Sequence, residues 1–248
     1  VSYTYGSDSN DGLNTVPLKT IEAARNKIGN GKGFIYIMDY PEISSPIAFS
    51  GSSQDITIAS TDYDRNNNPQ TELSGYIKTL RRSGTKSMFT VDGGAKVKFT
   101  DITLDGGSSS GAAPLIDVTN GTLNVISGAT IKNAKGGDGS AIKVTGSASG
   151  LEINGGAITG NTSTGNGSVY YNGSESGFKV QNSVSITGNT ASGDIAAPNV
   201  YLPTGKYITV AGDLGDSRIG VTTQDKPVSS PNGVSSTPDQ EILIAKPG

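Results

Sequence analysis

Histidine is absent from this 248-residue sequence, and its absence excludes several kinds of chemistry. Without histidine there is no Ser-His-Asp triad, no histidine-ligated zinc and no histidine general base. Cysteine is absent as well, so the chain has neither disulfides nor thiolate sites. Any catalysis must therefore use carboxylates, lysine, arginine or tyrosine.

The sequence also lacks a basic surface and a long apolar run. Its formal net charge is −3 at pH 7, which provides no electrostatic footprint for nucleic acid. No apolar run reaches the length of a transmembrane helix, so we expect no membrane span. Hydrophobic residues make up only 33% of the chain, which suits a solenoid with a thin core and a large surface. The 35 glycines are typical of many short strands joined by tight turns.

An internal repeat is the main positive feature of the sequence. The peptide Ile-Thr-Gly-Asn-Thr occurs at 158–162 and again, 28 residues later, at 186–190. A period of this length is typical of stacked-repeat architectures. Apolar-polar-apolar triplets recur at similar spacing in three series. The first is 89–91, 116–118, 142–144, 169–171 and 200–202; the second is 97–99, 123–125, 151–153, 178–180 and 208–210; the third contains 102–104, 129–131, 157–158 and 184–186.

These triplets predict an all-β chain that winds as a single-stranded right-handed parallel β-helix. Each triplet has the in-out-in alternation of a half-buried strand. Three short strands in about 27 residues make one rung of such a solenoid, and strands of successive rungs pair in parallel about 4.8 Å apart. The register then places one residue per rung in a single interior file, which contains Val91, Val118, Val144 and Tyr171.

The same register predicts neighbours on the outside. Asp117 lies beside Lys143 and Glu152 beside Lys179, so each pair can form an ion pair across rungs. Asn161 and Asn189 fall in the same turn of consecutive rungs, where we expect their amides to stack and to bond the turn backbone. Asn133 sits two residues after its isoleucine rather than three, so the spacing leaves open whether it joins this stack.

We expect one β-helix domain over residues 1–248 with a cap at its N-terminal end. The N-terminal part, 1–32, has a short capping helix predicted over Lys19–Ile28, with Thr20 as its N-cap and Gly29 at its end. The rungs occupy 33–221, with early strands predicted at 34–38, 47–49, 56–58 and 75–80.

The C-terminal part, 222–248, is rich in proline, serine and aspartate. It predicts a loop over 222–240 followed by a closing strand at 242–244. The final Lys246–Gly248 is typical of a linker, so we expect further domains of the same parent chain.

These features resemble the pectin-lyase-like right-handed parallel β-helix superfamily. The opening stretch 5–13, followed by 17–21, is similar to the start of many of its members. More narrowly, the chain resembles the pectate-lyase-like adhesive domains of Gram-positive bacterial surface proteins, through Leu80–Arg82 leading to Met88–Val91, Phe99–Gly106, and Asn199–Pro203 with Ile208–Val210. The resemblance covers about residues 1–222 and implies a secreted or cell-surface location. It does not fix activity, because the superfamily mixes enzymes with binding proteins.

The resemblance also implies a lyase alternative. Polysaccharide lyases of this fold generally use Ca²⁺ held by carboxylates and an arginine or lysine base. The candidates here are Asp62, Asp64, Arg65, Arg81 and Arg82, although a solvated polar loop is the plainer interpretation of 61–68. Hydrolases of this fold use a Gly-His-Gly motif, which a chain without histidine does not contain.

Asp8, Asn10 and Asp11 crowd one glycine-flanked loop. Hard oxygen ligands at this spacing can hold Ca²⁺, but the full twelve-residue calcium loop with its terminal glutamate is missing. The alternative is an Asx-rich turn without metal. We expect no other cofactor.

Tyr170 and Tyr201 occupy the same outward column on neighbouring rungs, whereas Tyr171 points inward. Two exposed rings at rung spacing can line a shallow glycan site, or they can pack on each other as a cross-strand pair.

We therefore expect a monomeric, non-enzymatic surface module, an adhesin or glycan-binding domain, whose partner is an extracellular polysaccharide or a host-surface glycan or protein. The alternatives are the Ca²⁺-dependent lyase and a structural spacer.

Overall fold

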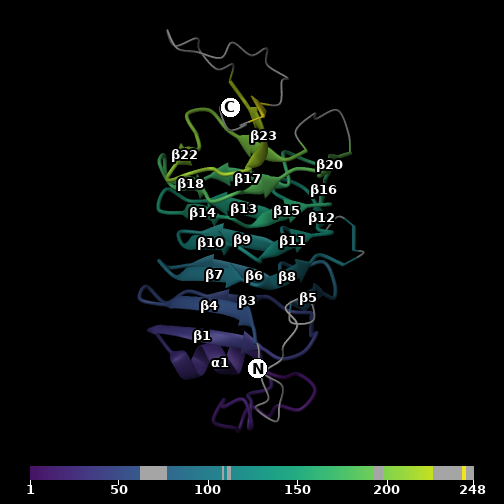
Figure 1. Ribbon diagram of the computed structural model, residues 1–248, viewed down its shortest axis with the longest axis vertical. Coiled ribbons are helices and arrows are strands. Elements are labelled where there is room, and N and C mark those ends of the chain that lie inside the picture. Colours follow the sequence, from purple (N-terminus) through teal and green to yellow (C-terminus); the bar gives the residue numbers. More distant parts are fainter. Residues whose placement is uncertain (62–76, 108, 111–112, 193–197, 226–241, 244–248) are drawn as a thin grey trace.

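The computed structural model of the protein describes residues 1–61, 77–107, 109–110, 113–192, 198–225 and 242–243. It shows a parallel β-helix with one short helix at its N-terminal end, as the repeat predicts (Figure 1). Rungs follow one another along the long axis in sequence order, from α1 and β1 at one end to β22 and β23 at the other. Within the described ranges, no helix is long and apolar enough to cross a membrane.

Strands of successive rungs form three ladders of parallel pairs. The first sheet contains β1 (Lys32–Ile37), β4 (Asp55–Ser60), β7 (Lys96–Thr100), β10 (Thr122–Ile126), β14 (Gly150–Asn154), β18 (Phe178–Gln181) and β22 (Thr209–Val210). The second sheet contains β2 (Glu42–Ile43), β5 (Lys78–Arg82), β8 (Ile102–Asp105), β11 (Thr130–Lys132), β15 (Ala157–Thr159) and β19 (Ser185–Ile186). The third sheet contains β3 (Ile47–Phe49), β6 (Phe89–Asp92), β9 (Ile116–Thr119), β13 (Ile142–Thr145), β17 (Val169–Asn172) and β21 (Val200–Leu202).

The C-terminal rung closes these ladders. Strand β23 (Arg218–Thr223) pairs with both β19 and β21, which joins the second and third sheets into one continuous 14-stranded sheet. Strand β24 (Ile242–Leu243) pairs antiparallel with β23, so the predicted closing strand is confirmed over these two residues; its third residue, Ile244, lies outside the described ranges. A small fourth sheet contains β12 (Lys135–Gly136), β16 (Thr162–Ser163) and β20 (Thr190–Ala191).

The predicted interior file is present. Val91 pairs with Val118, Val118 with Val144, and Val144 with Tyr171, and all four side chains are fully buried. Alternation along each strand sends the intervening residues outward, which is why a chain with few apolar residues still fills its core.

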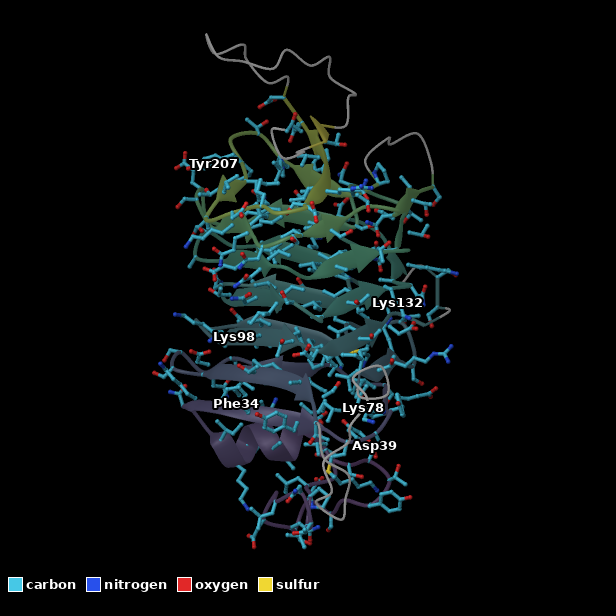
Figure 2. The ribbon with its side chains drawn as sticks, viewed as in Figure 1. Phe34, Asp39, Lys78, Lys98, Lys132 and Tyr207 are labelled. Atoms are coloured by element: carbon cyan, nitrogen blue, oxygen red, sulfur yellow. The ribbon has the colours of Figure 1, made fainter. Side chains whose placement is uncertain are left out.

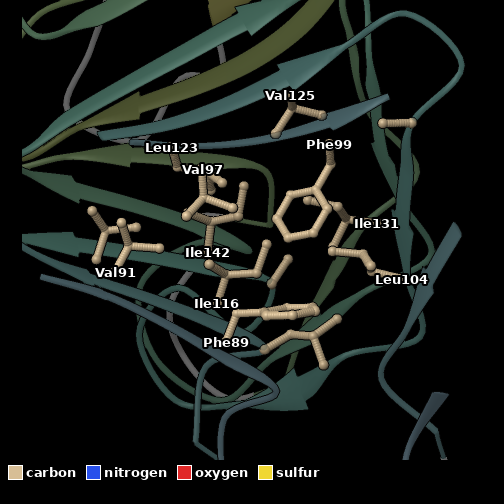
Figure 3. Close-up of a cluster of buried hydrophobic side chains, with 14 of the residues drawn as sticks. Phe89, Val91, Val97, Phe99, Leu104, Ile116, Leu123, Val125, Ile131 and Ile142 are labelled. Carbon is tan, nitrogen blue, oxygen red and sulfur yellow. The ribbon is translucent and has the colours of Figure 1, made fainter. Parts of the chain in front are cut away.

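Apolar side chains from all three sheets meet inside the coil (Figure 3). Three phenylalanines pack together in this core: the ring centroids of Phe49 and Phe89 are 6.3 Å apart, and those of Phe89 and Phe99 are 5.0 Å apart. Around them pack branched residues, among them Val97, Leu104, Ile116, Leu123, Val125, Ile131 and Ile142. Burying each such side chain stabilises the fold by about 1.5–3 kcal/mol, so this core is a major favourable contribution to folding.

Helix α1 (Ile21–Ile28) caps the N-terminal end, where Ile21 and Ala24 are buried in the core. Thr20 is the N-cap, as predicted, and its Oγ1 accepts a hydrogen bond from Ala23 N at 3.1 Å. The helix does not include Lys19, which corrects the predicted start. The N–H groups of Lys19 and Thr20 both donate to Asp8 Oδ1, at 2.9 and 2.8 Å, and Thr20 is extended.

Several strand limits differ from the predictions, among them those of β1 (Lys32–Ile37, predicted 34–38) and β4 (Asp55–Ser60, predicted 56–58). Strand β22 begins at Thr209, and Val210 pairs with Val180 as expected but is 53% exposed, because β22 is the last strand of its sheet. Strand β23 continues to Thr223, past the predicted start of the C-terminal loop at 222. Strand β5 begins at Lys78, and residues 75–76 of the predicted strand lie outside the described ranges.

The asparagine stack exists and excludes Asn133. Asn161 Nδ2 donates to Asn189 Oδ1 at 2.9 Å, and Asn189 Nδ2 donates to Asn199 Oδ1 at 2.9 Å. The ladder therefore extends to Asn199, which the repeat spacing did not predict. Asn133 has φ +58° and aligns with Gly160 at φ +66°, a left-handed position that asparagine tolerates. Ala134 therefore takes the ladder position in that rung, and its N–H donates to Asn161 Oδ1 at 2.9 Å.

Candidate functional site

The third sheet presents two outward columns of side chains along the solenoid. The first column contains Thr90, Asp117, Lys143, Tyr170, Tyr201 and Thr222. The second contains Asp92, Thr119, Thr145 and Asn172. The first column is charged and aromatic, and the second offers mainly hydroxyl and amide groups. We call the part of this surface around the two tyrosines the tyrosine face.

Tyr170 and Tyr201 stack on each other, with centroids 5.9 Å apart and planes 11° from parallel. Near-parallel planes at this centroid separation describe an offset stack, in which each ring is shifted sideways relative to the other. The side of the stack next to Tyr170 is occupied by Lys143, whose Nζ lies 5.8 Å from the ring centroid. The other side, next to Tyr201, faces the small side chain of Thr222.

Two carboxylates flank the tyrosine face at opposite ends of its strands. Asp138 precedes β13, and its Oδ1 accepts a hydrogen bond from Asn166 N at 2.7 Å, which holds it beside the segment leading into β17. Asp225 follows β23, and the neighbouring Gln224 N donates to Leu202 O at 2.9 Å, which ties this segment to the end of β21.

The pKa values of the face reflect burial and these carboxylates. Burial raises the pKa of Tyr170, and the negative charge of Asp138 raises it further. Burial also raises the pKa of Tyr201, with Asp138 and Asp225 adding to the shift. Both phenols therefore keep their protons at neutral pH and can donate hydrogen bonds. Burial raises the pKa of Asp117, and Lys143 partly opposes this.

Sequence reasoning placed both tyrosines in one outward column, and the stack confirms the alternative in which they pack on each other as a cross-strand pair. Contact of the two rings with a glycan stays a prediction. Tyr171 is fully buried, as expected, and its hydroxyl donates to Ser174 O at 2.7 Å. Glu152 and Lys179 form the expected ion pair at 3.5 Å. Lys143 is in register with Asp117, as expected, but its ammonium lies over the ring of Tyr170. Asp138 and Asp225 were missed because both lie in connecting segments, where no strand register indicates which way a side chain lies.

The three residues of the predicted calcium loop are used by other contacts. Asp8 accepts the backbone N–H groups before α1, and its Oδ2 accepts the Thr20 hydroxyl at 3.0 Å. Asn10 Nδ2 donates to Pro17 O at 2.9 Å, and Asp11 lies 3.4 Å from Lys27. Among the described residues, no group of three or more acidic, histidine or cysteine side chains is placed to hold a metal. Calcium binding at this loop stays a prediction.

The lyase candidates divide between two regions. Asp62, Asp64 and Arg65 lie outside the described residues. Arg81 is exposed and sits in register between Glu42 and Asp105. Arg82 is only 3% exposed; its Nε donates to Gly106 O at 3.1 Å and its Nη1 to Ala113 O at 2.7 Å. These bonds fix its guanidinium inside the fold, away from any substrate on the surface.

A second exposed aromatic pair lies at the N-terminal end. Phe34 and Tyr36 on β1 stack with centroids 5.9 Å apart and are 64% and 50% exposed; Figure 2 shows Phe34 above α1. They border a cavity of about 350 Å³ whose other lining is mainly apolar, including Leu13, Leu18 and Ile35. A polyhydroxylated ligand would leave hydroxyl groups unpaired against such a lining.

Comparison of the chain with family models, with curated protein sequences and with solved structures found no match.

Proposed function

We propose that this chain is a non-enzymatic β-helix module, secreted or displayed at a cell surface, that binds an extended glycan on the tyrosine face. The observation that carries the proposal is the Tyr170–Tyr201 stack in the first column, beside the hydroxyl and amide groups of the second column. The half-buried rings supply apolar contact, while the hydroxyl of Thr145, the amide of Asn172 and the two phenols supply hydrogen-bonding groups. A sugar ring requires this mixture of apolar and polar contacts.

The rung repeat suits an extended polymer. Equivalent positions recur about 4.8 Å apart along a straight axis, so a chain of sugars can run along the columns and contact several rungs. The resemblance of 80–91, 99–106 and 199–210 to pectate-lyase-like adhesive domains supports the same function and a bacterial cell-surface location.

A binding assay with paired variants tests the proposal. Immobilised polysaccharides of several classes are incubated with the protein, with Tyr170→Ala/Tyr201→Ala and with Phe34→Ala/Tyr36→Ala. We expect the wild type and the Phe34/Tyr36 variant to bind one class, and the Tyr170/Tyr201 variant to lose about tenfold or more in affinity.

Three other outcomes would redirect the assignment. Loss of binding only in the Phe34/Tyr36 variant would move the site to the N-terminal end. Release of unsaturated products from polygalacturonate with Ca²⁺ would make the chain a lyase. Binding to no polysaccharide class would favour a structural spacer.

A further inference from the structure

We propose that the free edge of β1 binds an extended peptide of a partner protein, which adds there as one more parallel strand. The peptide buries an apolar side chain in the cavity of about 350 Å³ beside Phe34 and Tyr36, here called the N-terminal cavity. This site is separate from the tyrosine face and goes beyond the proposed function. Three features support it: unpaired main-chain groups on β1, the cavity beside them, and a pairing that Val1 already makes on the same edge.

One edge of β1 lacks a neighbouring strand, because β1 is the first strand of its sheet (Figure 1). Ile37 O accepts a hydrogen bond from Thr61 N, so the odd-numbered residues of β1 direct their main-chain groups toward the β4 side. The even-numbered residues Phe34 and Tyr36 direct theirs to the opposite edge. Within the described ranges, no residue pairs with the N–H or C=O of Phe34 or with the N–H of Tyr36. These groups are a template for another strand.

Val1 shows how a main chain pairs with this edge. Tyr36 O accepts a hydrogen bond from the Val1 amino group, and Met38 N donates to Val1 O at 2.9 Å. These two bonds place Val1 opposite Ile37 in the pattern of a parallel strand. The Val1 side chain packs against the core, on the same side as the buried side chain of Ile37.

The same pattern is available two residues earlier on β1. A partner residue opposite Ile35 donates its N–H to Phe34 O, and its C=O accepts the Tyr36 N–H. Side chains in register point the same way, and Ile35 is buried, so the partner's side chain points inward. There it meets the N-terminal cavity. The apolar lining of this cavity includes Leu13, Leu18 and Ala24.

The rim of the N-terminal cavity is exposed. Leu13 is 61% exposed, and the stacked rings of Phe34 and Tyr36 are exposed as well. Exposed apolar side chains gathered beside a free strand edge are typical of an interaction site. Because Val1 fills the next position, the partner chain ends or turns away directly after its inward residue. The site therefore favours a peptide whose last paired residue is valine, isoleucine or leucine, since only a second main chain also satisfies the alternating groups of β1.

Methylated peptides test the strand pairing. A labelled peptide of alternating threonine and valine that ends on valine is titrated with the 248-residue protein, and fluorescence anisotropy measures its affinity. N-methylation of the final valine removes the N–H that Phe34 O accepts, and we expect a loss of about tenfold. N-methylation of the preceding threonine, whose N–H points away from β1, should change the affinity by less than about threefold.

A matched pair of protein variants tests the same bond from the other side. Tyr36→Pro removes the free N–H but keeps the carbonyl that Val1 uses, and proline is tolerated on strand edges whose N–H is unpaired. It should weaken peptide binding by about tenfold, whereas Tyr36→Thr, which keeps the N–H, should weaken it by less than about threefold. Circular dichroism checks that both variants are folded, and both should bind polysaccharide like the wild type.

Several results would overturn strand addition. Equal affinity for the two methylated peptides would show an apolar cavity without main-chain pairing. Absence of peptide binding, or unchanged binding by a folded Tyr36→Pro, would also overturn it. Self-association of the protein that hides the peptide site would assign the edge to a second copy instead. None of these results bears on polysaccharide binding at the tyrosine face, which the paired tyrosine variants test separately.

Discussion

Asn161 combines complete burial with several hydrogen bonds, so replacing it tests how far one residue supports the coil. Its Nδ2 donates to Ile131 O at 3.1 Å and its Oδ1 accepts Ala134 N. Asn161→Ala leaves these backbone groups buried without partners, at about 1–3 kcal/mol each. We expect a loss of about 3 kcal/mol in the free energy of unfolding, measured by urea denaturation.

Asn133 provides the matched control for that measurement. It is exposed and left-handed, a conformation that glycine adopts without strain. Asn133→Gly should change the unfolding free energy by less than about 0.5 kcal/mol, despite the loss of its bond to Asp105 Oδ2. Equal losses of unfolding free energy in Asn161→Ala and Asn133→Gly would show that the buried hydrogen bonds of the asparagine ladder are not the source of the stability.

Asp117 is expected to make stability depend on pH. Because its pKa is raised in the folded state, the folded protein binds a proton more tightly there than the unfolded chain. The ionised carboxylate therefore disfavours folding, and this penalty disappears as pH falls toward the unfolded value near ~3.9. Asp117→Asn should be more stable than the wild type at neutral pH, with the difference shrinking on acidification. Urea denaturation at several pH values measures it, and a difference that grows toward acid would contradict the burial argument.

At the scale of elements, the start of helix α1 tests the calcium prediction. Thr20→Ala removes the N-cap acceptor and should cost about 1 kcal/mol. Asp8→Ala should cost more, because its carboxylate accepts two N–H groups and one hydroxyl. We expect both losses in melting temperature to be the same with Ca²⁺ and with a chelator. A wild-type melting temperature that rises with Ca²⁺, but not in Asp8→Ala, would instead indicate a metal site.

The elements that were predictable are those with apolar triplets. Strands β6, β9, β13 and β17 each bury two large side chains, so alternation alone marked them and fixed the Val91–Tyr171 file. Strands β12, β16 and β20 were not predicted, because their two residues are small or polar and only neighbouring rungs hold them in place. Asn133 was ambiguous for a related reason: spacing alone does not distinguish a ladder amide from a left-handed turn residue.

At the scale of the molecule, the ends of the solenoid expose large hydrophobic side chains, whereas its described sides expose mainly polar ones. The exposed large hydrophobic side chains among the described residues lie in the first forty residues or near the C-terminal end, at Tyr207 and Val210; Figure 2 shows Phe34 and Tyr207 at opposite ends. The third sheet carries the two outward columns along one side of the solenoid, and the half-buried tyrosine stack lies in the first of them. Strand register predicted which residues share a column, but the flanking Asp138 and Asp225 depend on how connections fold across rungs, which periodicity does not encode.

If each rung is an equivalent unit, the coil should tolerate the loss of one whole rung. Deleting 119–144 joins Val118 to Thr145, which takes the register position of Thr119. Two rung interfaces are replaced by one, so we expect a folded β-protein that is less stable by about 1–4 kcal/mol, judged from usual stability per residue, and shorter by about 4.8 Å in small-angle scattering. Deleting only 119–131 removes about half a rung, puts later strands out of register and should abolish the cooperative unfolding transition. Two folded deletion variants, or two unfolded ones, would contradict the idea that stability is added rung by rung.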